Sequence, residues 1–186
     1  MATEQQCRRL LVISGPPGVG KDTVITILTN LSSFERVPSC TTRPPRGGEI
    51  DGIDYNFLTT QEFEDRSDLF LDNVTMNGYR YGLPIADVRR TLEQRGDVVV
   101  QLIVQSAELL KKQIPSAVLV YLSPPNSSSL EERLRARGDS ELEIKARLSE
   151  PLLTMFPTGY YDLVLTNQDY NPGEVVNRIL QYLDMT

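Results

Sequence analysis

Apolar and polar positions follow two patterns that alternate along the chain. Four short apolar runs are bounded by turn-forming residues, which is typical of buried strands: Leu10–Ile13, Val98–Val104, Ala117–Leu122 and Leu163–Leu165. The segments around them carry apolar residues at helical spacing: Val24–Leu31, Ala86–Arg95, Ser106–Gln113, Ser129–Arg137, Glu141–Phe156 and Pro172–Leu183. Strands that alternate with helices predict an α/β fold, in which helices flank a parallel sheet.

The pattern changes between residues 34 and 84. Turn-forming pairs separate short strand-like pieces there: Pro44 and Pro45, Gly47 and Gly48, and Asp51 and Gly52. We therefore predict one domain with a small β-rich insert over residues 34–84. Its core is expected to consist of residues 1–33, 85–136 and 150–186.

A glycine-rich loop joins the first predicted strand to the first predicted helix. Its sequence over residues 15–23 is Gly-Pro-Pro-Gly-Val-Gly-Lys-Asp-Thr. The glycines let the backbone fold tightly around an anion, and the N-terminus of the following helix favours negative charge. Lys21 adds a cation for the β- and γ-phosphates. The pattern is that of a P-loop NTPase-type fold, and it predicts ATP binding by Gly15, Pro16, Pro17, Gly18, Val19, Gly20, Lys21, Asp22 and Thr23.

The residue after the lysine is an aspartate, where a serine or threonine usually binds Mg²⁺. The Asp22 carboxylate can also bind Mg²⁺, and it is our candidate metal ligand. Alternatively, Asp22 points away from the nucleotide and caps the start of the helix. The loop resembles that of nucleoside monophosphate kinases, which implies that Thr23 supplies the hydroxyl for a phosphate oxygen.

Composition narrows the possible functions. The chain of 186 residues has a net charge of −6 and contains no histidine. The acidic balance argues against a nucleic-acid partner, and the lack of histidine favours a reaction that depends on positioning and charge neutralisation. Cys7 and Cys40 have no metal-ligand spacing, so free thiols are expected. With neither a run of membrane-spanning length nor an apolar signal-peptide core near Met1, we expect a cytoplasmic protein without a membrane partner.

A second anion site is predicted in the insert. Arg43 and Arg46 lie in a loop stiffened by proline and glycine, and guanidinium groups bind phosphate through paired, charge-assisted hydrogen bonds. Tyr55 and Tyr81 would add neutral donors. The alternative is that the two arginines only form surface salt bridges with Glu49 and Asp51.

Several separated motifs together resemble the guanylate kinase family, in family order over about residues 9 to 184. Residues 39–49 read Ser-Cys-Thr-Thr-Arg-Pro-Pro-Arg-Gly-Gly-Glu and are followed by Asp-Gly-Ile-Asp-Tyr. Residues 78–82 read Gly-Tyr-Arg-Tyr-Gly, residues 130–138 resemble the family's lid, and residues 161–167 resemble its last core strand. The resemblance implies a helical lid over residues 137–149.

The resemblance also implies roles for individual residues. Those expected to hold the acceptor monophosphate are Ser39, Arg43, Arg46, Tyr55, Asp72, Tyr81 and Gln105. Those expected to act in catalysis are Lys21, Arg43, Arg133, Arg137 and Arg147, with Asn167 on the adenine side and Mg²⁺ bound together with ATP. From the residues alone, the lid arginines also fit a solvated helix face that pairs with Glu131 and Glu132.

The chain departs from the family where the acceptor base is read. The family's glutamate is Asp72, and the hydroxyl residues commonly found after Tyr81-Gly82 are replaced by Leu83 and Pro84. The family's Glu-x-Asp-x-Gln-Gly appears as Gln-Leu-Ile-Val-Gln-Ser over residues 101–106. An apolar residue such as Ile103 cannot accept a hydrogen bond from guanine, and an unpaired donor costs about 1–3 kcal/mol.

The leading hypothesis is a kinase that transfers the γ-phosphoryl group of ATP to GMP or dGMP, as a monomer or homodimer. One alternative is a kinase that acts on a different or modified nucleoside monophosphate. The other is a non-catalytic guanylate-kinase-like module that binds a phosphorylated peptide, although the chain retains Lys21, Thr23 and the lid arginines.

Overall fold

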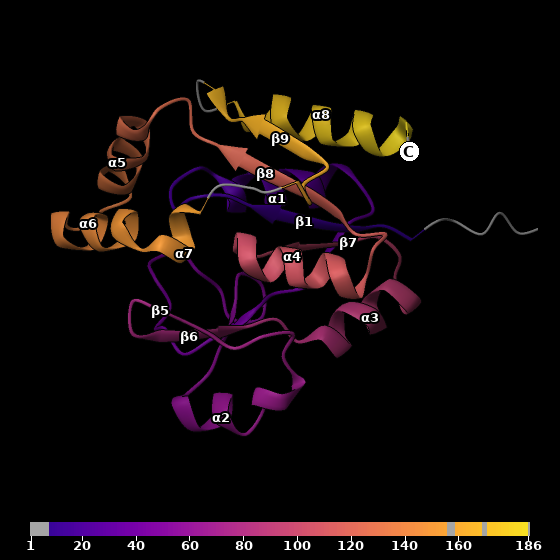
Figure 1. Ribbon diagram of the computed structural model, residues 1–186, viewed down its shortest axis with the longest axis horizontal. Coiled ribbons are helices and arrows are strands. Elements are labelled where there is room, and N and C mark those ends of the chain that lie inside the picture. The colour runs from indigo at the N-terminus through magenta and orange to yellow at the C-terminus, as the bar shows by residue number, and fades with distance from the viewer. Residues whose placement is uncertain (1–7, 156–158, 169–170, 186) are drawn as a thin grey trace, which may run out of the picture.

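A five-stranded parallel sheet forms the centre of the molecule (Figure 1). The sequence predicted a parallel sheet and four of its strands. The computed structural model describes residues 8–155, 159–168 and 171–185. The strands are β1 (Leu10–Ser14), β2 (Glu35–Arg36), β7 (Val98–Gln101), β8 (Val118–Ser123) and β9 (Leu163–Thr166), in the order β2-β7-β1-β8-β9. Every pairing in this sheet is parallel. The loop after β1 therefore leaves the middle of the sheet at its carboxyl edge.

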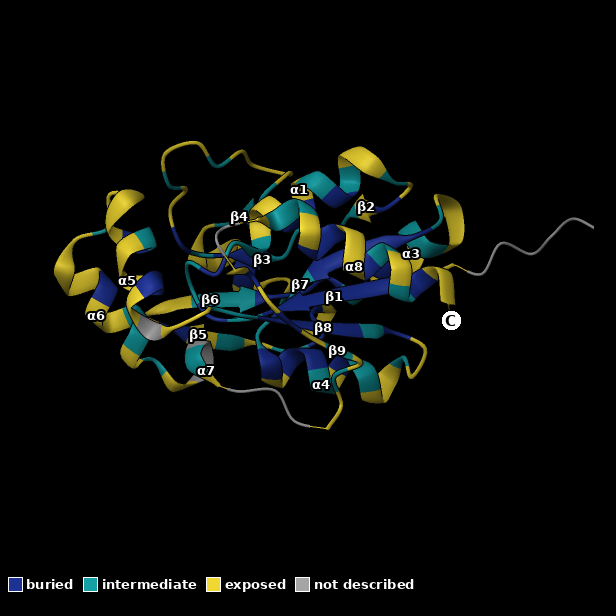
Figure 2. Cartoon of the chain, turned by 90° about the horizontal axis from the view of Figure 1, so that it is seen from above, coloured by how far each residue is buried: buried dark blue, intermediate teal, exposed yellow. Residues whose placement is uncertain are grey.

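Helices cover both faces of this sheet, because successive side chains of a strand point to opposite faces. Leu11 and Ile13 of β1 belong to the core on the side of α1 (Lys21–Leu31) and α8 (Pro172–Met185). Leu10 and Val12 belong to the core shared with α3 (Ile85–Gln94) and α4 (Val104–Gln113). Seen from above, the buried strands lie between helices whose outer sides are exposed (Figure 2).

The insert folds around a second, four-stranded sheet with the order β4-β3-β6-β5. Its elements are β3 (Cys40–Thr41), β4 (Asn56–Phe57), α2 (Thr60–Glu64), the 3-10 helix η1 (Ser67–Leu69), β5 (Val74–Met76) and β6 (Tyr79–Gly82). Phe63, Phe70 and Cys40 form a small apolar cluster of their own beneath this sheet. Because β2 pairs with β7 in the central sheet, the insert's own sheet begins at β3, later than the predicted start at residue 34.

The predicted lid, residues 137–149, lies within a run of three helices: α5 (Ser127–Ala136), α6 (Glu141–Ser149) and α7 (Pro151–Thr154). The prediction of a single helix over Glu141–Phe156 is wrong, because Glu150 is extended and Pro151 begins a new helix. A residue before proline disfavours helical geometry, which explains the break. Phe156, the predicted end, lies outside the described residues.

A second boundary also differs from the prediction. β7 ends at Gln101 rather than at Val104, and Ile103 is the N-cap of α4. Two residues predicted for a buried strand therefore lie at the start of a helix, beside the cavity described below. The apolar pattern does not distinguish these states, because a buried first helical turn is as apolar as a strand end.

The C-terminal helix α8 is amphipathic. Val175, Val176, Ile179 and Leu183 are its buried side chains, and they pack on the α1 side of the central sheet. Among the described residues, no helix combines the length and the apolar character that crossing a membrane requires.

Candidate active site

One cavity of about 880 Å³ joins the P-loop, the inserted sheet and the lid. Most residues predicted for the site line it: Gly15, Pro17, Gly18, Gly20, Lys21, Asp22, Thr23, Ser39, Arg43, Arg46, Tyr55, Asp72, Tyr81, Arg133, Arg137, Arg147 and Asn167. Pro16 and Val19 are part of the loop but do not line the cavity. Gln105 is exposed on α4 and does not line it either, whereas its neighbour Ser106 does. The structure thus gives no support to Gln105 as an acceptor ligand.

The P-loop keeps its shape through glycine at two crowded positions. Gly15 has φ of 147°, and a Cβ there would overlap the carbonyl oxygen of Leu122 in β8. Gly20 has φ of 97°, and a Cβ there would lie 2.9 Å from Nδ2 of Asn167. Both conformations are ones that glycine adopts readily and other residues do not. At these two positions the loop therefore presents backbone rather than a side chain to the cavity.

Lys21 is the first residue of α1 and folds back over the loop. Its Nζ donates to the carbonyl oxygens of Gly15 (2.8 Å) and Pro16 (3.0 Å). Burial lowers the pKa of Lys21 to about 8, with Asp22 acting to raise it and Arg137 to lower it. A bound phosphate would supply the negative charge that this buried ammonium group lacks.

Asp22 does not cap the helix, and it does not belong to a group of side chains that could hold a metal. Gly20 is the N-cap of α1 and makes no side-chain cap hydrogen bond, while Asp22 is exposed and accepts from Arg36 NH2 at 2.9 Å. Arg36 also bonds the backbone oxygen of Asp54 (3.0 Å) and its carboxylate (3.4 Å). Asp22 is therefore tied through Arg36 of β2 to Asp54 of the insert. Among the described residues, no cluster of three or more Asp, Glu, His or Cys side chains is placed to hold a metal.

The two insert arginines share one carboxylate, Glu49. Arg43 is buried and meets Glu49 through two hydrogen bonds of 2.8 and 2.9 Å, while Arg46 lies 3.9 Å from the same group. Burial acts against the charge of Arg43, but its bond to Glu49 raises the pKa. Asp51 instead accepts from the backbone N–H of Phe57. The salt-bridge alternative is thus correct for Glu49 and wrong for Asp51, and both arginines still line the cavity.

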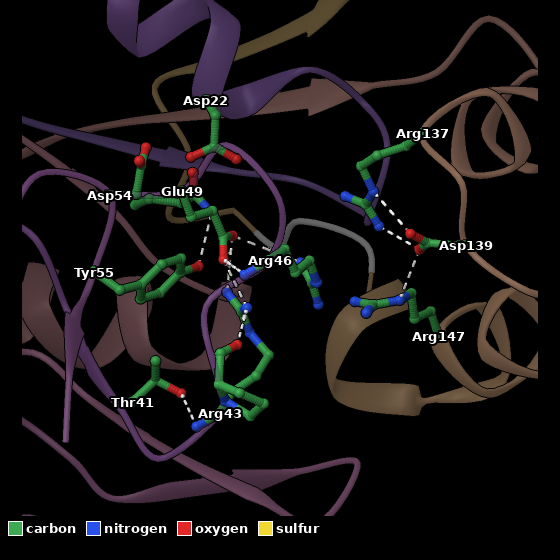
Figure 3. Close-up of polar contacts among 12 residues, drawn as sticks. Asp22, Thr41, Arg43, Arg46, Glu49, Asp54, Tyr55, Arg137, Asp139 and Arg147 are labelled. Carbon is green, nitrogen blue, oxygen red and sulfur yellow. Dashed lines mark hydrogen bonds and ion pairs between the residues drawn. The ribbon is translucent and has the colours of Figure 1, made fainter. Parts of the chain in front are cut away.

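In a second arginine cluster, on the predicted lid, two arginines again contact one carboxylate. Asp139 accepts hydrogen bonds from Arg137 and forms an ion pair with Arg147, whose Nε lies 3.1 Å from Oδ2. Burial acts to raise the pKa of Asp139, but the hydrogen bond from Arg137 keeps it low. Figure 3 shows Arg46 between the Glu49 cluster and the Asp139 cluster. Burial lowers the pKa of Arg46, and Arg147, Arg43 and Arg137 lower it further. These cations repel one another, so an anion bound among them would relieve the repulsion.

The other lid arginine, Arg133, reaches the P-loop. Its NH1 donates to the carbonyl oxygen of Gly18 in the P-loop at 3.0 Å. Arg135, whose side chain points elsewhere, makes the surface contacts, with Glu131 and Glu141. Helix α5 thus directs Arg133 toward the P-loop and Arg135 toward the solvent-exposed side of the helix.

Asn167 follows β9 and closes the opposite side of the loop. It is buried, and its Nδ2 donates to the carbonyl oxygen of Val19 at 2.8 Å. Its Oδ1 is buried and accepts no hydrogen bond from the described residues. A free acceptor beside the P-loop fits the predicted place on the adenine side.

At the far end of the cavity, side chains replace backbone as the lining. Asp72 accepts a hydrogen bond from Ser106, and Gln101 Nε2 lies 3.4 Å from the Tyr55 hydroxyl. Burial raises the pKa of Tyr55, which keeps this hydroxyl protonated. Apolar side chains complete the surface, with Leu83, Leu102 and Ile103 among them.

From the sequence, Glu49 was named as a partner only in the salt-bridge alternative, and the other partners of the predicted residues were not named. Glu49, Asp139, Arg36 and Ser106 hold functional side chains in place, yet each lies in another segment or is separated from its partner by a turn. The signal for Glu49 was its place in the Arg-Gly-Gly-Glu run. For Ser106, the only signal was that it replaces a glycine.

A P-loop on a parallel sheet, an arginine-lined inserted sheet and an arginine-bearing lid around one cavity define a P-loop nucleoside monophosphate kinase. The family model for guanylate kinase matches residues 7–183. The chain therefore belongs to the guanylate kinase family.

Individual relatives agree with this assignment. The chain is 39% identical over 178 residues to a guanylate kinase of Streptococcus thermophilus, covering 92% of this chain and 85% of that protein. It is 41% identical over 163 residues to a guanylate kinase of Thermus thermophilus, covering 86% and 74%. The crystal structure of guanylate kinase from Anaplasma phagocytophilum superposes with a TM-score of 0.74 at 24% identity, covering 97% of this chain and 87% of that one, and supports the fold.

Proposed function

We propose that this protein transfers the γ-phosphoryl group of ATP to GMP or dGMP and releases ADP with GDP or dGDP. The observation that carries the proposal is one cavity lined by the P-loop, by Arg43 and Arg46 and by the lid arginines, and Figure 3 shows Arg46 beside Arg137 and Arg147. The names of the relatives described above, all guanylate kinases, support the same reaction. They do not favour another nucleotide acceptor or a non-catalytic peptide-binding module.

The residues divide the reaction between two ends of the cavity. The P-loop backbone and Lys21 bind the ATP phosphates, while Arg43, Arg46, Tyr55 and Tyr81 bind the phosphate of the acceptor. An oxygen of that acceptor phosphate attacks the γ-phosphorus in line, and the bond to the β-phosphate oxygen of ATP breaks. Arg133, Arg137 and Arg147 neutralise the charge on the transferring group, which supplies most of the catalysis in such reactions.

Mg²⁺ is expected to enter with ATP. Magnesium often keeps several waters and is held largely by substrate phosphates, with one or two protein ligands. This fits the donors present: the Thr23 side chain lines the cavity, and the Asp22 carboxylate is exposed but paired with Arg36. We assign Thr23 as the nearer candidate and Asp22 as the candidate that must first leave Arg36.

The cytoplasm is the proposed location, since Cys40 is a free, buried thiol and such thiols persist in reducing compartments. A monomer or homodimer without a nucleic-acid partner remains the prediction for its assembly.

A coupled assay of ADP formation tests the proposal. The purified protein is given ATP, Mg²⁺ and, in turn, GMP, dGMP, AMP, CMP and UMP. We expect the highest kcat/KM with GMP or dGMP, and Lys21→Met run in parallel shows that the activity belongs to this protein. Turnover of GMP no faster than that of the other nucleotides would overturn the choice of acceptor.

A further inference from the structure

Two side chains from different parts of the chain meet in the lining of the cavity. Asp72 follows the 3-10 helix η1 of the insert, and Ser106 lies in the first turn of α4 in the core. Both line the cavity, and the Ser106 hydroxyl donates a hydrogen bond to Oδ2 of Asp72. Ser106 is 3% exposed, so its side chain has little freedom to turn elsewhere.

The two residues match each other in size. The family pattern described above has glutamate and glycine at these positions, where this chain has aspartate and serine. The carboxylate side is shorter by one methylene, and the opposite side has gained a hydroxymethyl group. In this chain the added hydroxyl group of Ser106 reaches the shorter carboxylate and donates a hydrogen bond to it.

The bond leaves the carboxylate able to bind a ligand. An ionised carboxylate has about four acceptor positions on its two oxygens, and Ser106 uses one of them. Burial raises the pKa of Asp72, and the hydrogen bond from Ser106 offsets part of this rise. The other groups at this end are less suited to bind two donors, because Leu83 and Ile103 have no acceptor and Gln101 is near Tyr55.

We propose that Ser106 is a positioning residue for acceptor specificity, which holds the Asp72 carboxylate against the N1–H and 2-amino donors of the guanine base. This inference rests on the proposed transfer to GMP. The pair compensates for the missing carboxylate at Ile103, and it makes the 2-amino group of the base the feature that this chain reads.

Kinetics with GMP and IMP test the pair, because IMP lacks the 2-amino group and keeps N1–H. At saturating ATP, Ser106→Ala is expected to lower the ratio of kcat/KM for GMP to that for IMP by about tenfold, the effect of one lost hydrogen bond to a charged group. The change should lie in KM for GMP, with kcat and KM for ATP within about twofold of wild type, because the phosphates are held elsewhere.

The matched control is Ser129→Ala. Ser129 is also the third residue of its helix and is also buried, but its hydroxyl donates to the backbone oxygen of Asn126 at 2.7 Å. This variant is expected to change the melting temperature and to leave the GMP/IMP ratio as in wild type. A fall of the ratio in both variants would overturn the proposal, because it would show a general effect of destabilisation.

Two further variants, which change Asp72 alone and Asp72 together with Ser106, test the proposal if Ser106→Ala is unstable. Asp72→Glu alone is expected to lose the GMP/IMP preference, and Asp72→Glu combined with Ser106→Gly is expected to regain it. A ratio unchanged in Ser106→Ala, or no recovery in the double variant, overturns the role of Ser106 while wild-type turnover of GMP still upholds the proposed function. If wild type neither binds GMP in calorimetry nor phosphorylates it, both proposals fail.

Discussion

The two ends of the cavity are built in different ways. At the ATP end, nine consecutive residues form the P-loop, and their backbone makes the binding surface. At the end assigned to the acceptor base, the lining comes from side chains of the insert, β7 and α4, which are far apart in the chain. A backbone surface tolerates changes in neighbouring side chains, whereas a side-chain surface changes with each substitution. This contrast explains why phosphate handling is retained in a chain whose base-reading residues differ from the family pattern.

The largest effect is expected at the ATP end. Lys21→Met should lower kcat by about 10³-fold, because it removes a cation aimed at the charge that develops on the transferring phosphoryl group. KM for GMP should change little. Lys112→Met, an exposed lysine of α4 outside the cavity, is the control and should keep wild-type rates. Steady-state kinetics in both substrates measure this, and a large rise in KM for GMP with an unchanged kcat would contradict the division between the two ends.

The lid provides the next comparison, between two arginines at one end of a helix. Arg137 lines the cavity with Asp139 and Arg147, whereas Arg135 points outward to Glu131 and Glu141. Arg137→Ala should lower kcat by about 10²-fold through lost charge stabilisation, while Arg135→Ala should change kcat by less than about twofold. Equal losses in the two variants would mean that the lid helices matter through stability, which thermal melting of both variants would reveal.

The pH dependence of ATP affinity should test the ATP end of the cavity without any mutation. The pKa of Lys21 is lowered by burial from 10.5 to about 8 in the free protein, and bound phosphate would raise it again. Below this pKa the lysine is charged in both states, so ATP affinity is constant. Above it, binding must take up a proton, and Kd for ATP should rise by about tenfold per pH unit.

Calorimetry from about pH 7 to about pH 9.5, in buffers of different ionisation enthalpy, measures both the affinity and the proton uptake. Lys21→Met should show no uptake in this range. A constant Kd for ATP across the range, or proton release on binding, would contradict a lysine that is uncharged in the free protein at high pH.

The smallest effect is expected at Asp22. Its partner Arg36 is mostly buried but Asp22 itself is exposed, and exposed ion pairs contribute about 0–1 kcal/mol. Asp22→Asn should therefore change kcat/KM by less than about fivefold and leave the Mg²⁺ dependence of the rate as in wild type. A much higher Mg²⁺ requirement in this variant would show that Asp22 leaves Arg36 and binds the metal.

The contrast between a contiguous motif and a surface built from distant segments also explains which features could be predicted from the sequence. The central sheet, its helices and the P-loop depend on local periodicity and on one contiguous motif, so four of the strands were expected close to where they lie. The two-residue edge strand β2 was missed, because Glu35 and Arg36 carry no apolar signal and pair with β7 through the backbone. The helix break at Pro151 was missed because the apolar spacing continues across it.

The site was predicted as a set of residues but not as a set of contacts. Arg43, Arg46, Arg137 and Arg147 do lie around one cavity. Of the carboxylates that hold them, Glu49 was named only in the salt-bridge alternative, and Asp139 was not named. Gln105 was expected at the acceptor through its motif, but the start of α4 turns its side chain outward and places Ser106 at the cavity. Such pairings depend on the residue at which a helix begins and on how the insert packs against the core. The sequence pattern around a single residue carries little information about either.

Product stoichiometry is the most direct test of phosphoryl transfer between the two ends of one cavity. Chromatography of a mixture of ATP, Mg²⁺, GMP and protein measures ADP and GDP together, with a parallel sample that lacks GMP. The proposed function predicts one GDP for every ADP and almost no ADP without GMP, because water is a poor substitute for an acceptor held by Arg43 and Arg46. ADP formed without matching GDP, or at the same rate in the absence of GMP, would contradict it.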